Sequence, residues 1–254
     1  MLNNVILALL AWLLVAEPVL AAVSCSVLTQ DNSTTNATSY TTASVTPTAN
    51  ALVLLATVAT RNSTSCVDND VVSVTGNSLT WANIDRQCFS SAGTPVHTVE
   101  LWRTMGASPS TGTIDFSFGG TSQIDAAWAV IECTGVDTSG TNGSGAVVQS
   151  AKNLIEPGTS LTVTLGAFGD ANNATLGVFG TADNAAITEG SGFTELAEQL
   201  VSDAGFDIGL QVEWKTSNDT SVDASFASID AGGVAIEIKA AAVTDDGGEV
   251  IWFP

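Results

Sequence analysis

Carboxylates on predicted strands are the side chains in this sequence best suited to catalysis. Glycoside hydrolysis needs only two carboxyl groups, about 5 to 9.5 Å apart, one as proton donor and one as nucleophile or base. The candidates on predicted strands are Glu100, Asp115, Glu132 and Glu213. Their spacing singles out no pair, so a non-catalytic protein is the preferred interpretation and a glycoside hydrolase with a carboxylate pair is the alternative.

The alternation of apolar and polar residues predicts different surroundings for these acids. It places Asp115 and Glu213 on solvated strand faces, whereas Glu132 lies within an apolar run. A buried carboxylate is costly without a partner. We therefore expect Glu132 to form a structural ion pair with Arg103 or Arg86.

Other common kinds of catalytic and binding site lack their residues. The single histidine, His97, excludes a multi-histidine metal site and is expected to be exposed at the start of a strand. The sequence has no G-x-S-x-G motif and no CxxC pair, and the glycine-rich run 140–145 lacks the lysine of a phosphate-binding loop. A net charge of −20, from 26 acidic and 6 basic residues, argues against nucleic acid as a partner.

Two acidic clusters on predicted loops offer the hard oxygen atoms that Ca²⁺ prefers. Neither has the spacing of an EF-hand or of a calcium-binding repeat. We expect ordinary acidic turns and no cofactor, and calcium is the alternative. The candidate ligands are Asp68, Asp70, Asp245, Asp246 and Glu249.

Exposed aromatic side chains on a β-sandwich would form a glycan-binding surface. Trp102, which shares a predicted strand face with Glu100, is the first candidate, and Trp81, beside a predicted hairpin, is the second. Trp128 and Trp214 align with apolar neighbours and are expected in the core. A carbohydrate-binding module is therefore an alternative function.

Six N-x-S/T sequons are candidate glycosylation sites, and nearly all of them fall in predicted turns. A chain rich in Asn, Ser and Thr also produces such sequons by chance. The sites are Asn32, Asn36, Asn62, Asn142, Asn173 and Asn218.

The even number of cysteines fits an oxidising compartment. Cys66 and Cys88 flank a hairpin-like segment at residues 71–81, and a bridge between them leaves Cys25 and Cys133 to pair. Buried free thiols are the alternative.

The first residues read as an export signal. Val5–Ala16 is an apolar run of about 18 Å as a helix, too short for a bilayer core of about 30 Å, and a helix breaker and small residues follow it. Residues 1–22 are therefore predicted to be a signal peptide, which places the protein outside the cell or on a cell or virion surface. Because no basic residue precedes Arg61, a retained hydrophobic anchor is the alternative.

Alternation of apolar and polar residues dominates the rest of the chain, as in strands with one buried and one solvated face. Residues 160–165 (SLTVTL) are an example. Ala51–Ala59 and Ala126–Ile131 are apolar on both faces and are expected at sheet centres. Glu195–Val201, with two leucines four residues apart, predicts the single helix.

About a dozen strands separated by glycine- and asparagine-rich turns predict an all-β fold. We expect a two-sheet antiparallel sandwich of jelly-roll type with little helix, formed by residues 45–241 as one domain. An N-terminal strand and polar linker (23–44) precede it, and an acidic turn and apolar C-terminal tail (242–254) follow.

Several runs carry a resemblance to a known kind of domain. They include GASPSTGTIDFSF (106–118), AAWAVIECTGVDTSGTNGSGAVVQS (126–150), SLTVTLGAFGDANNATLGVFG (160–180), GSGFTEL (190–196), EWKTSNDTSVDASFA (213–227) and GGVAIEIKAA (232–241). Over roughly residues 45–241 the chain resembles an uncharacterised β-sandwich domain of environmental secreted bacterial and phage-associated proteins. The resemblance implies a fold and a surface setting but no activity. Cys66, Cys88 and Cys133 depart from its usual pattern, which suggests added disulfide bonds here.

These observations favour a non-catalytic extracellular structural or adhesive surface protein. Its expected partners are copies of itself or other surface proteins, with polysaccharide as a further possibility and the membrane only through an uncleaved N-terminal segment. Ser24–Thr29 and Val250–Phe253 are short apolar segments suited to adding a strand to a neighbour's sheet, unless both pair within their own domain. A virion tail or decoration protein is a further alternative.

Overall fold

The computed structural model describes residues 22–90 and 94–242, which form fourteen β-strands and one short 3₁₀ helix, η1 (Cys66–Asn69). The strands pair antiparallel, so the predicted all-β antiparallel fold is confirmed. The predicted signal peptide up to residue 21 and the predicted tail from residue 243 lie outside the described residues. Within the described ranges, no helix has the length and hydropathy needed to cross a bilayer.

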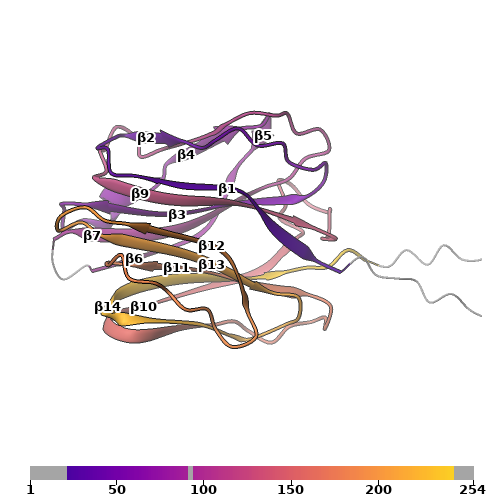
Figure 1. Ribbon diagram of the computed structural model, residues 1–254. Helices are drawn as coiled ribbons and strands as arrows, with labels where there is room; N and C mark the ends of the chain where they lie inside the picture. The colour runs from indigo at the N-terminus through magenta and orange to yellow at the C-terminus, as the bar shows by residue number, and fades with distance from the viewer. Residues whose placement is uncertain (1–21, 91–93, 243–254) are drawn as a thin grey trace, which may run out of the picture.

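The strands form three sheets, which lie one above another in Figure 1. We name them the top, middle and bottom sheets after their positions in that view. The top sheet has the order β2 (Ser39–Thr41), β8 (Ile114–Ser117), β4 (Ser73–Gly76) and β5 (Leu79–Thr80). The middle sheet has the order β1 (Ser24–Ser33), β9 (Asp125–Thr134), β3 (Leu52–Arg61), β7 (Val96–Thr104) and β6 (Ala82–Phe89). The bottom sheet has the order β10 (Val147–Thr164), β14 (Ser221–Ile238), β11 (Ala174–Thr181), β13 (Ile208–Lys215) and β12 (Thr194–Val201).

The three central strands of the middle sheet, β9, β3 and β7, are buried on both faces. Along β3, Leu54 and Val58 belong to the core shared with the bottom sheet, whereas Val53 and Leu55 belong to the core shared with the top sheet. This explains why the segments predicted at sheet centres, now in β3 and β9, carry apolar residues on both faces. A strand buried on both faces needs a covering layer on each side, and the structure accordingly has three sheets where the sequence predicted two. The jelly-roll connectivity stays a prediction.

The two longest strands also cover the outer face of the bottom sheet. The pairing of β10 with β14 shifts register on either side of Gly158. Beyond this point Val163 and Val222 join a third apolar cluster around Phe179 of β11. The approach is close, because a Cβ atom added to Gly177 would lie 2.6 Å from the Val222 Cγ1 atom. The end of β10 and the start of β14 thus form a fourth layer on the outer face of the bottom sheet, and glycine at position 177 is required for this layer to pack.

Two local predictions have opposite outcomes. The predicted hairpin is present as β4 and β5, joined by Asn77 and Ser78, whose φ values of 54° and 57° are those of a tight two-residue hairpin turn. The predicted helix over Glu195–Val201 is wrong, because these residues belong to β12 and pair with β13 along its length. A segment this short gains more from hydrogen bonding to an existing sheet than from an isolated helix.

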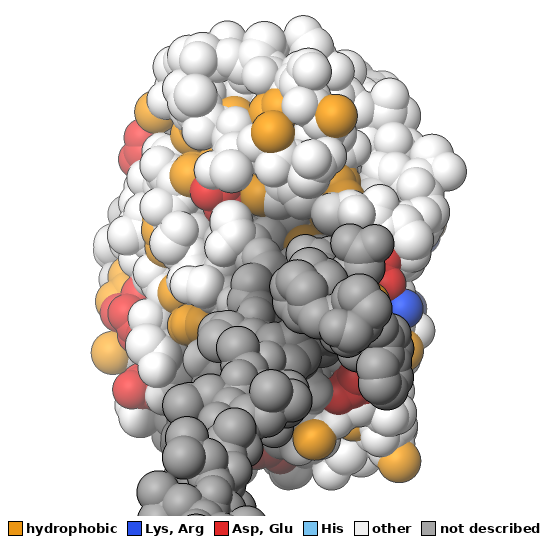
Figure 2. Space-filling model, turned by 90° about the vertical axis from the view of Figure 1, so that its right-hand side faces the viewer, with side chains coloured by type: hydrophobic (Ala, Val, Ile, Leu, Met, Phe, Trp, Pro, Cys, Tyr) orange, Lys and Arg blue, Asp and Glu red, His pale blue; other side chains and the backbone are white. Residues whose placement is uncertain are grey.

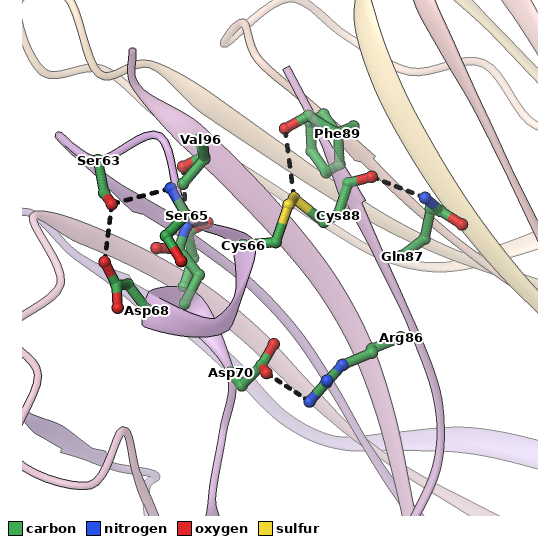
Figure 3. The surroundings of a disulfide bond; sticks show 12 residues. Ser63, Ser65, Cys66, Asp68, Asp70, Arg86, Gln87, Cys88, Phe89 and Val96 are labelled. Carbon is green, nitrogen blue, oxygen red and sulfur yellow. Dashed lines mark hydrogen bonds and ion pairs between the residues drawn. A yellow bond between two sulfur atoms is a disulfide. The ribbon is translucent and has the colours of Figure 1, made fainter. Parts of the chain in front are cut away.

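The two disulfide bonds join the predicted pairs of cysteines. Cys25 and Cys133 face each other in the β1–β9 ladder, with their Cα atoms 4.1 Å apart, and both side chains are buried in the core. Cys66 of η1 is bonded to Cys88 of β6, as Figure 3 shows. One disulfide thus fixes an edge strand to the middle sheet, and the other fixes a connecting segment to the opposite edge of the same sheet.

Removing each disulfide should destabilise the protein according to the length of chain it closes. The cysteines are 108 residues apart in one pair and 22 in the other. In the chain-entropy model these separations correspond to about 5 and about 3 kcal/mol. We expect Cys25→Ala/Cys133→Ala to lower the free energy of unfolding in urea more than Cys66→Ala/Cys88→Ala does. Equal losses of unfolding free energy in the two double variants, measured without reductant, would contradict this expectation.

Candidate functional site

The two tryptophans predicted to bind glycans are not exposed. Trp102 and Trp81 are each only 8% exposed and pack in the core between the middle and top sheets, as does Trp128. The prediction for Trp102 and Trp81 is therefore wrong, because the strand face taken as solvated is covered by the top sheet. Trp214 is half-buried against the core between the middle and bottom sheets.

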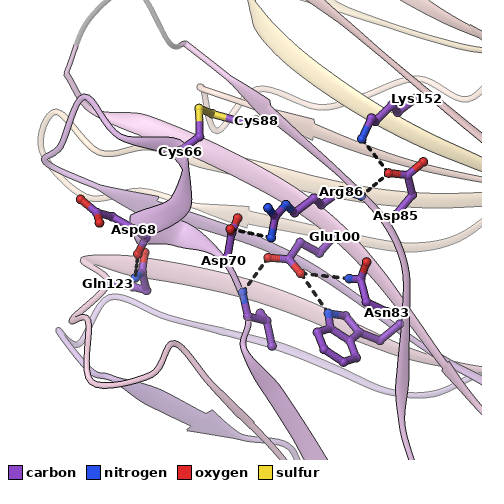
Figure 4. A network of polar contacts seen from close by, with 12 residues as sticks. Cys66, Asp68, Asp70, Asn83, Asp85, Arg86, Cys88, Glu100, Gln123 and Lys152 are labelled. Atoms are coloured by element: carbon purple, nitrogen blue, oxygen red, sulfur yellow. Dashed lines mark hydrogen bonds and ion pairs between the residues drawn. A yellow bond between two sulfur atoms is a disulfide. The ribbon is translucent and has the colours of Figure 1, made fainter.

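Glu100 is the centre of a buried polar network on β7, shown in Figure 4. Its carboxylate accepts hydrogen bonds from the Val71 backbone N–H (2.7 Å), the Trp102 Nε1–H (2.9 Å) and the Asn83 side-chain amide (3.3 Å). Burial raises the pKa of Glu100 to about 7, although these hydrogen bonds favour the ionised form. The carboxylate thus holds the segment that follows η1 against the middle sheet.

Glu132 of β9 has a different partner from the one expected. Its carboxylate accepts hydrogen bonds from the Thr48 backbone N–H and from the Thr48 hydroxyl, the latter at 2.9 Å. Arg86 instead pairs with Asp70, and Arg103 donates to backbone carbonyls of the segment after β9. The predicted ion pair is therefore wrong, because a connecting segment supplies the donors that the buried carboxylate needs.

The prediction that Glu213 lies on a solvated strand face is also wrong. Asp115 is exposed, as expected. Glu213 lies on the outer face of the bottom sheet and is fully buried there. Its carboxylate accepts a hydrogen bond from the Gly190 backbone N–H (2.9 Å), and burial raises its pKa to about 8. The segment between β11 and β12 therefore covers a face that alternation alone marks as open to water.

These acids do not form a catalytic pair in the described structure. Asp115 is on the top sheet and Glu213 on the bottom sheet. Glu100 and Glu132 share the middle sheet, but Glu100 is in register with Thr57 and Glu132 with Val53. Four residues along a strand correspond to roughly 13 Å, which exceeds the separation that glycoside hydrolysis uses.

The acidic clusters show no arrangement for calcium in the part of the chain that the structure describes. Asp70 pairs with Arg86 at 2.5 Å, and Asp68 accepts a hydrogen bond from the Ser63 hydroxyl at 2.7 Å. Among residues 22–90 and 94–242, no three His, Cys, Asp or Glu side chains are placed to hold a metal ion. The other candidates, Asp245, Asp246 and Glu249, lie outside the described residues.

The sequons differ in accessibility. Asn36, Asn62 and Asn218 are exposed, and Asn142 is half-buried. Asn32 lies within β1, not in a turn, and its side-chain amide donates to Gln199 at 2.8 Å. Asn173 is buried and its amide donates to the Glu237 carboxylate at 2.5 Å, so this predicted glycosylation site is wrong.

The structure reveals one candidate site that the sequence analysis missed. His97, predicted to be exposed, is 2% exposed and lines a cavity of about 310 Å³. We call this the His97 cavity and define it by Ser90, His97, Asp207 and Asp230. The available signal was the position of His97 two residues before the buried Val99, on the same strand face.

No protein-family model matches the chain, and no curated protein or solved structure was found to be similar to it.

The buried acids predict an unusual dependence of stability on pH. Burial raises the pKa of Glu100 and Asp125 to about 7 and that of Glu213 to about 8. Between their ordinary and raised values the folded state binds more protons than the unfolded state, so stability falls as pH rises. His97, whose pKa burial lowers to about 4, acts in the opposite direction between about pH 4 and 6.5. We expect the free energy of unfolding in urea to be at least about 2 kcal/mol lower at pH 8.5 than at pH 5.

Neutral variants identify the groups responsible. Glu213→Gln preserves the shape of the side chain and an acceptor for the Gly190 N–H but cannot ionise. Because the pKa of Glu213 is raised from 4.5 to about 8, this variant should flatten the decline in stability between about pH 4.5 and 8. Asp115→Asn, at an exposed position on the top sheet, is the matched control and should leave the profile unchanged. An unchanged slope in Glu213→Gln would contradict the assignment.

Proposed function

We propose that the protein is a non-catalytic structural or adhesive protein exposed outside the cell or on a virion. The main support is the role of its buried strand carboxylates. Glu100, Glu132 and Glu213 each accept a hydrogen bond from the backbone N–H of a connecting segment. Groups that catalyse proton transfer must meet a substrate, whereas these groups already hold the protein's own loops.

The disulfides and the charge also support an extracellular setting. Both disulfides lie in the middle sheet or join a segment to it, and disulfides persist in oxidising compartments. Outside the grey atoms, the face of the molecule in Figure 2 carries scattered acidic and hydrophobic side chains and little basic surface. A net charge of −20 keeps such a surface soluble and favours partners with positive charge.

Assembly by strand addition has one remaining candidate. Ser24–Thr29 lies in β1, which pairs with β9 and is bonded to it through Cys25 and Cys133. It is therefore not a free strand for donation to a neighbour. Val250–Phe253 lies outside the described residues, and self-assembly through it remains part of the proposal.

The assembly proposal predicts that the size of particles in solution depends on this segment. Light scattering of the full chain at rising concentration should give a mass above that of one chain. Replacing Val250–Phe253 by four serines, which keeps the length but removes the apolar surface, should reduce that mass toward the monomer. The variant Val148→Ser, at an exposed apolar position of β10, is the control.

Two results would overturn the proposal. An unchanged mass in the serine variant would remove the strand-addition mode of assembly. Hydrolysis of a polysaccharide by the purified chain, abolished by Glu100→Gln, Glu132→Gln or Glu213→Gln in a variant that remains folded, would make the protein an enzyme.

A further inference from the structure

The apolar core between the middle and bottom sheets ends in a row of polar residues. Thr60 of β3 is in register with Asp125 of β9 and with His97 of β7. All three side chains are buried, with exposures of 0%, 0% and 2%. The three side chains lie on the strand face that carries the core between the middle and bottom sheets. The next residues along this face, such as Val58 of β3, belong to that core. The row therefore marks where the interior of this double layer gives way to a polar site.

Several polar atoms at this end have no hydrogen-bond partner among the described residues 22–90 and 94–242. Both ring nitrogens of His97, both carboxylate oxygens of Asp125 and the Ser90 hydroxyl are buried without a hydrogen bond. Leaving such atoms buried without a hydrogen bond is costly in free energy. The His97 ring is held in place by Phe89, which stacks on it with ring centroids 5.2 Å apart and an angle of 17°. A cluster of unpartnered groups on so rigid a support calls for a ligand.

The His97 cavity lies at this polar end. Its walls bring His97 and Ser90, on the middle-sheet side, together with Asp207, which directly precedes β13, and Asp230 of β14. A volume of about 310 Å³ is at the lower end of the range for small-molecule sites. The cavity is at the opposite end of the strands from the Cys25–Cys133 disulfide.

The charge of the site is negative and is not balanced by the protein's own basic groups. Asp203 and Asp207 lie near enough to Asp125 to raise its pKa further, beyond the effect of burial. None of the ion pairs among the described residues reaches the cavity, because their acidic members are Asp70, Asp85, Asp137 and Asp219.

We propose that the His97 cavity binds the positively charged, N–H-rich end of an organic molecule, a primary ammonium or a guanidinium group. The carboxylates of Asp207 and Asp230 and the Ser90 hydroxyl are acceptors. Because burial lowers the pKa of His97 to about 4, its ring is neutral at pH 7 and offers a further lone pair. A ligand that donates several hydrogen bonds fits these acceptors. A metal ion fits less well, since no three ligating side chains in the described ranges are suitably placed.

The same chemistry has two sources, a free polyamine and a basic side chain of another protein. Isothermal titration of the folded chain with putrescine and agmatine tests the first, and titration with Nα-acetyl-lysine amide and Nα-acetyl-arginine amide tests the second. We expect saturable 1:1 binding of at least one of these four, with a Kd of about 1 mM or lower. The neutral sugar methyl glucoside and CaCl₂ are the comparison ligands.

Variants distinguish binding in the His97 cavity from binding to the acidic surface in general. Asp207→Asn and Asp230→Asn should each weaken binding about tenfold. Ala182→Leu, which places a larger side chain on the cavity wall, should weaken it with every acid retained. Asp115→Asn removes one charge from a distant exposed position and should leave the Kd unchanged. Thermal melting of each variant establishes that it is folded.

Three results would overturn the proposal. They are the absence of binding by all four cations, equal loss of affinity in Asp115→Asn and the two cavity variants, and retention of full affinity in folded Ala182→Leu. Binding of methyl glucoside or Ca²⁺ at this site in preference to the cations would likewise assign the cavity to a different ligand.

Discussion

The fold depends on buried carboxylates that hold connecting segments to the sheets. Glu100, Glu132 and Glu213 each accept a hydrogen bond from a backbone N–H outside the regular strands, and the half-buried Glu198 does the same. Segments that cross the faces of sheets have N–H groups with no ladder partner, and leaving them buried and unpaired is costly. A carboxylate on the underlying strand satisfies such a group with a hydrogen bond stronger than a neutral one. The loops can therefore serve as covering layers in a protein with very little helix.

The stacking of three sheets follows from the apolar middle strands, and much of it was visible in the sequence. The continuous apolar runs of β3 and β9 predicted their central position correctly. The same runs imply a covering layer on each face, yet the strands of the top sheet are only two to four residues long. Strands so short show little alternation of apolar and polar residues, and sequence periodicity therefore does not reveal the top sheet.

The errors in the predicted site residues have a common physical cause. Alternation assigns residues to two faces of a strand but does not say which face meets water. Trp102, His97 and Glu213 were each placed on an open face or end, and each is covered by another layer. The disulfide pairs, by contrast, were predictable because four cysteines allow few pairings and one pair flanks a local hairpin. The His97 cavity combines residues of distant segments and required the three-dimensional structure.

The two ends of the double layer formed by the middle and bottom sheets are built differently. Near the start and end of the described chain, the Cys25–Cys133 disulfide and the bridge between Val136 and Ala240 complete the apolar core. At the other end the core stops at Asp125 and His97, whose side-chain polar atoms have no hydrogen-bond partner in the described part of the chain. The described chain thus begins and ends near the apolar end of the double layer, and the acidic His97 cavity lies at the opposite end.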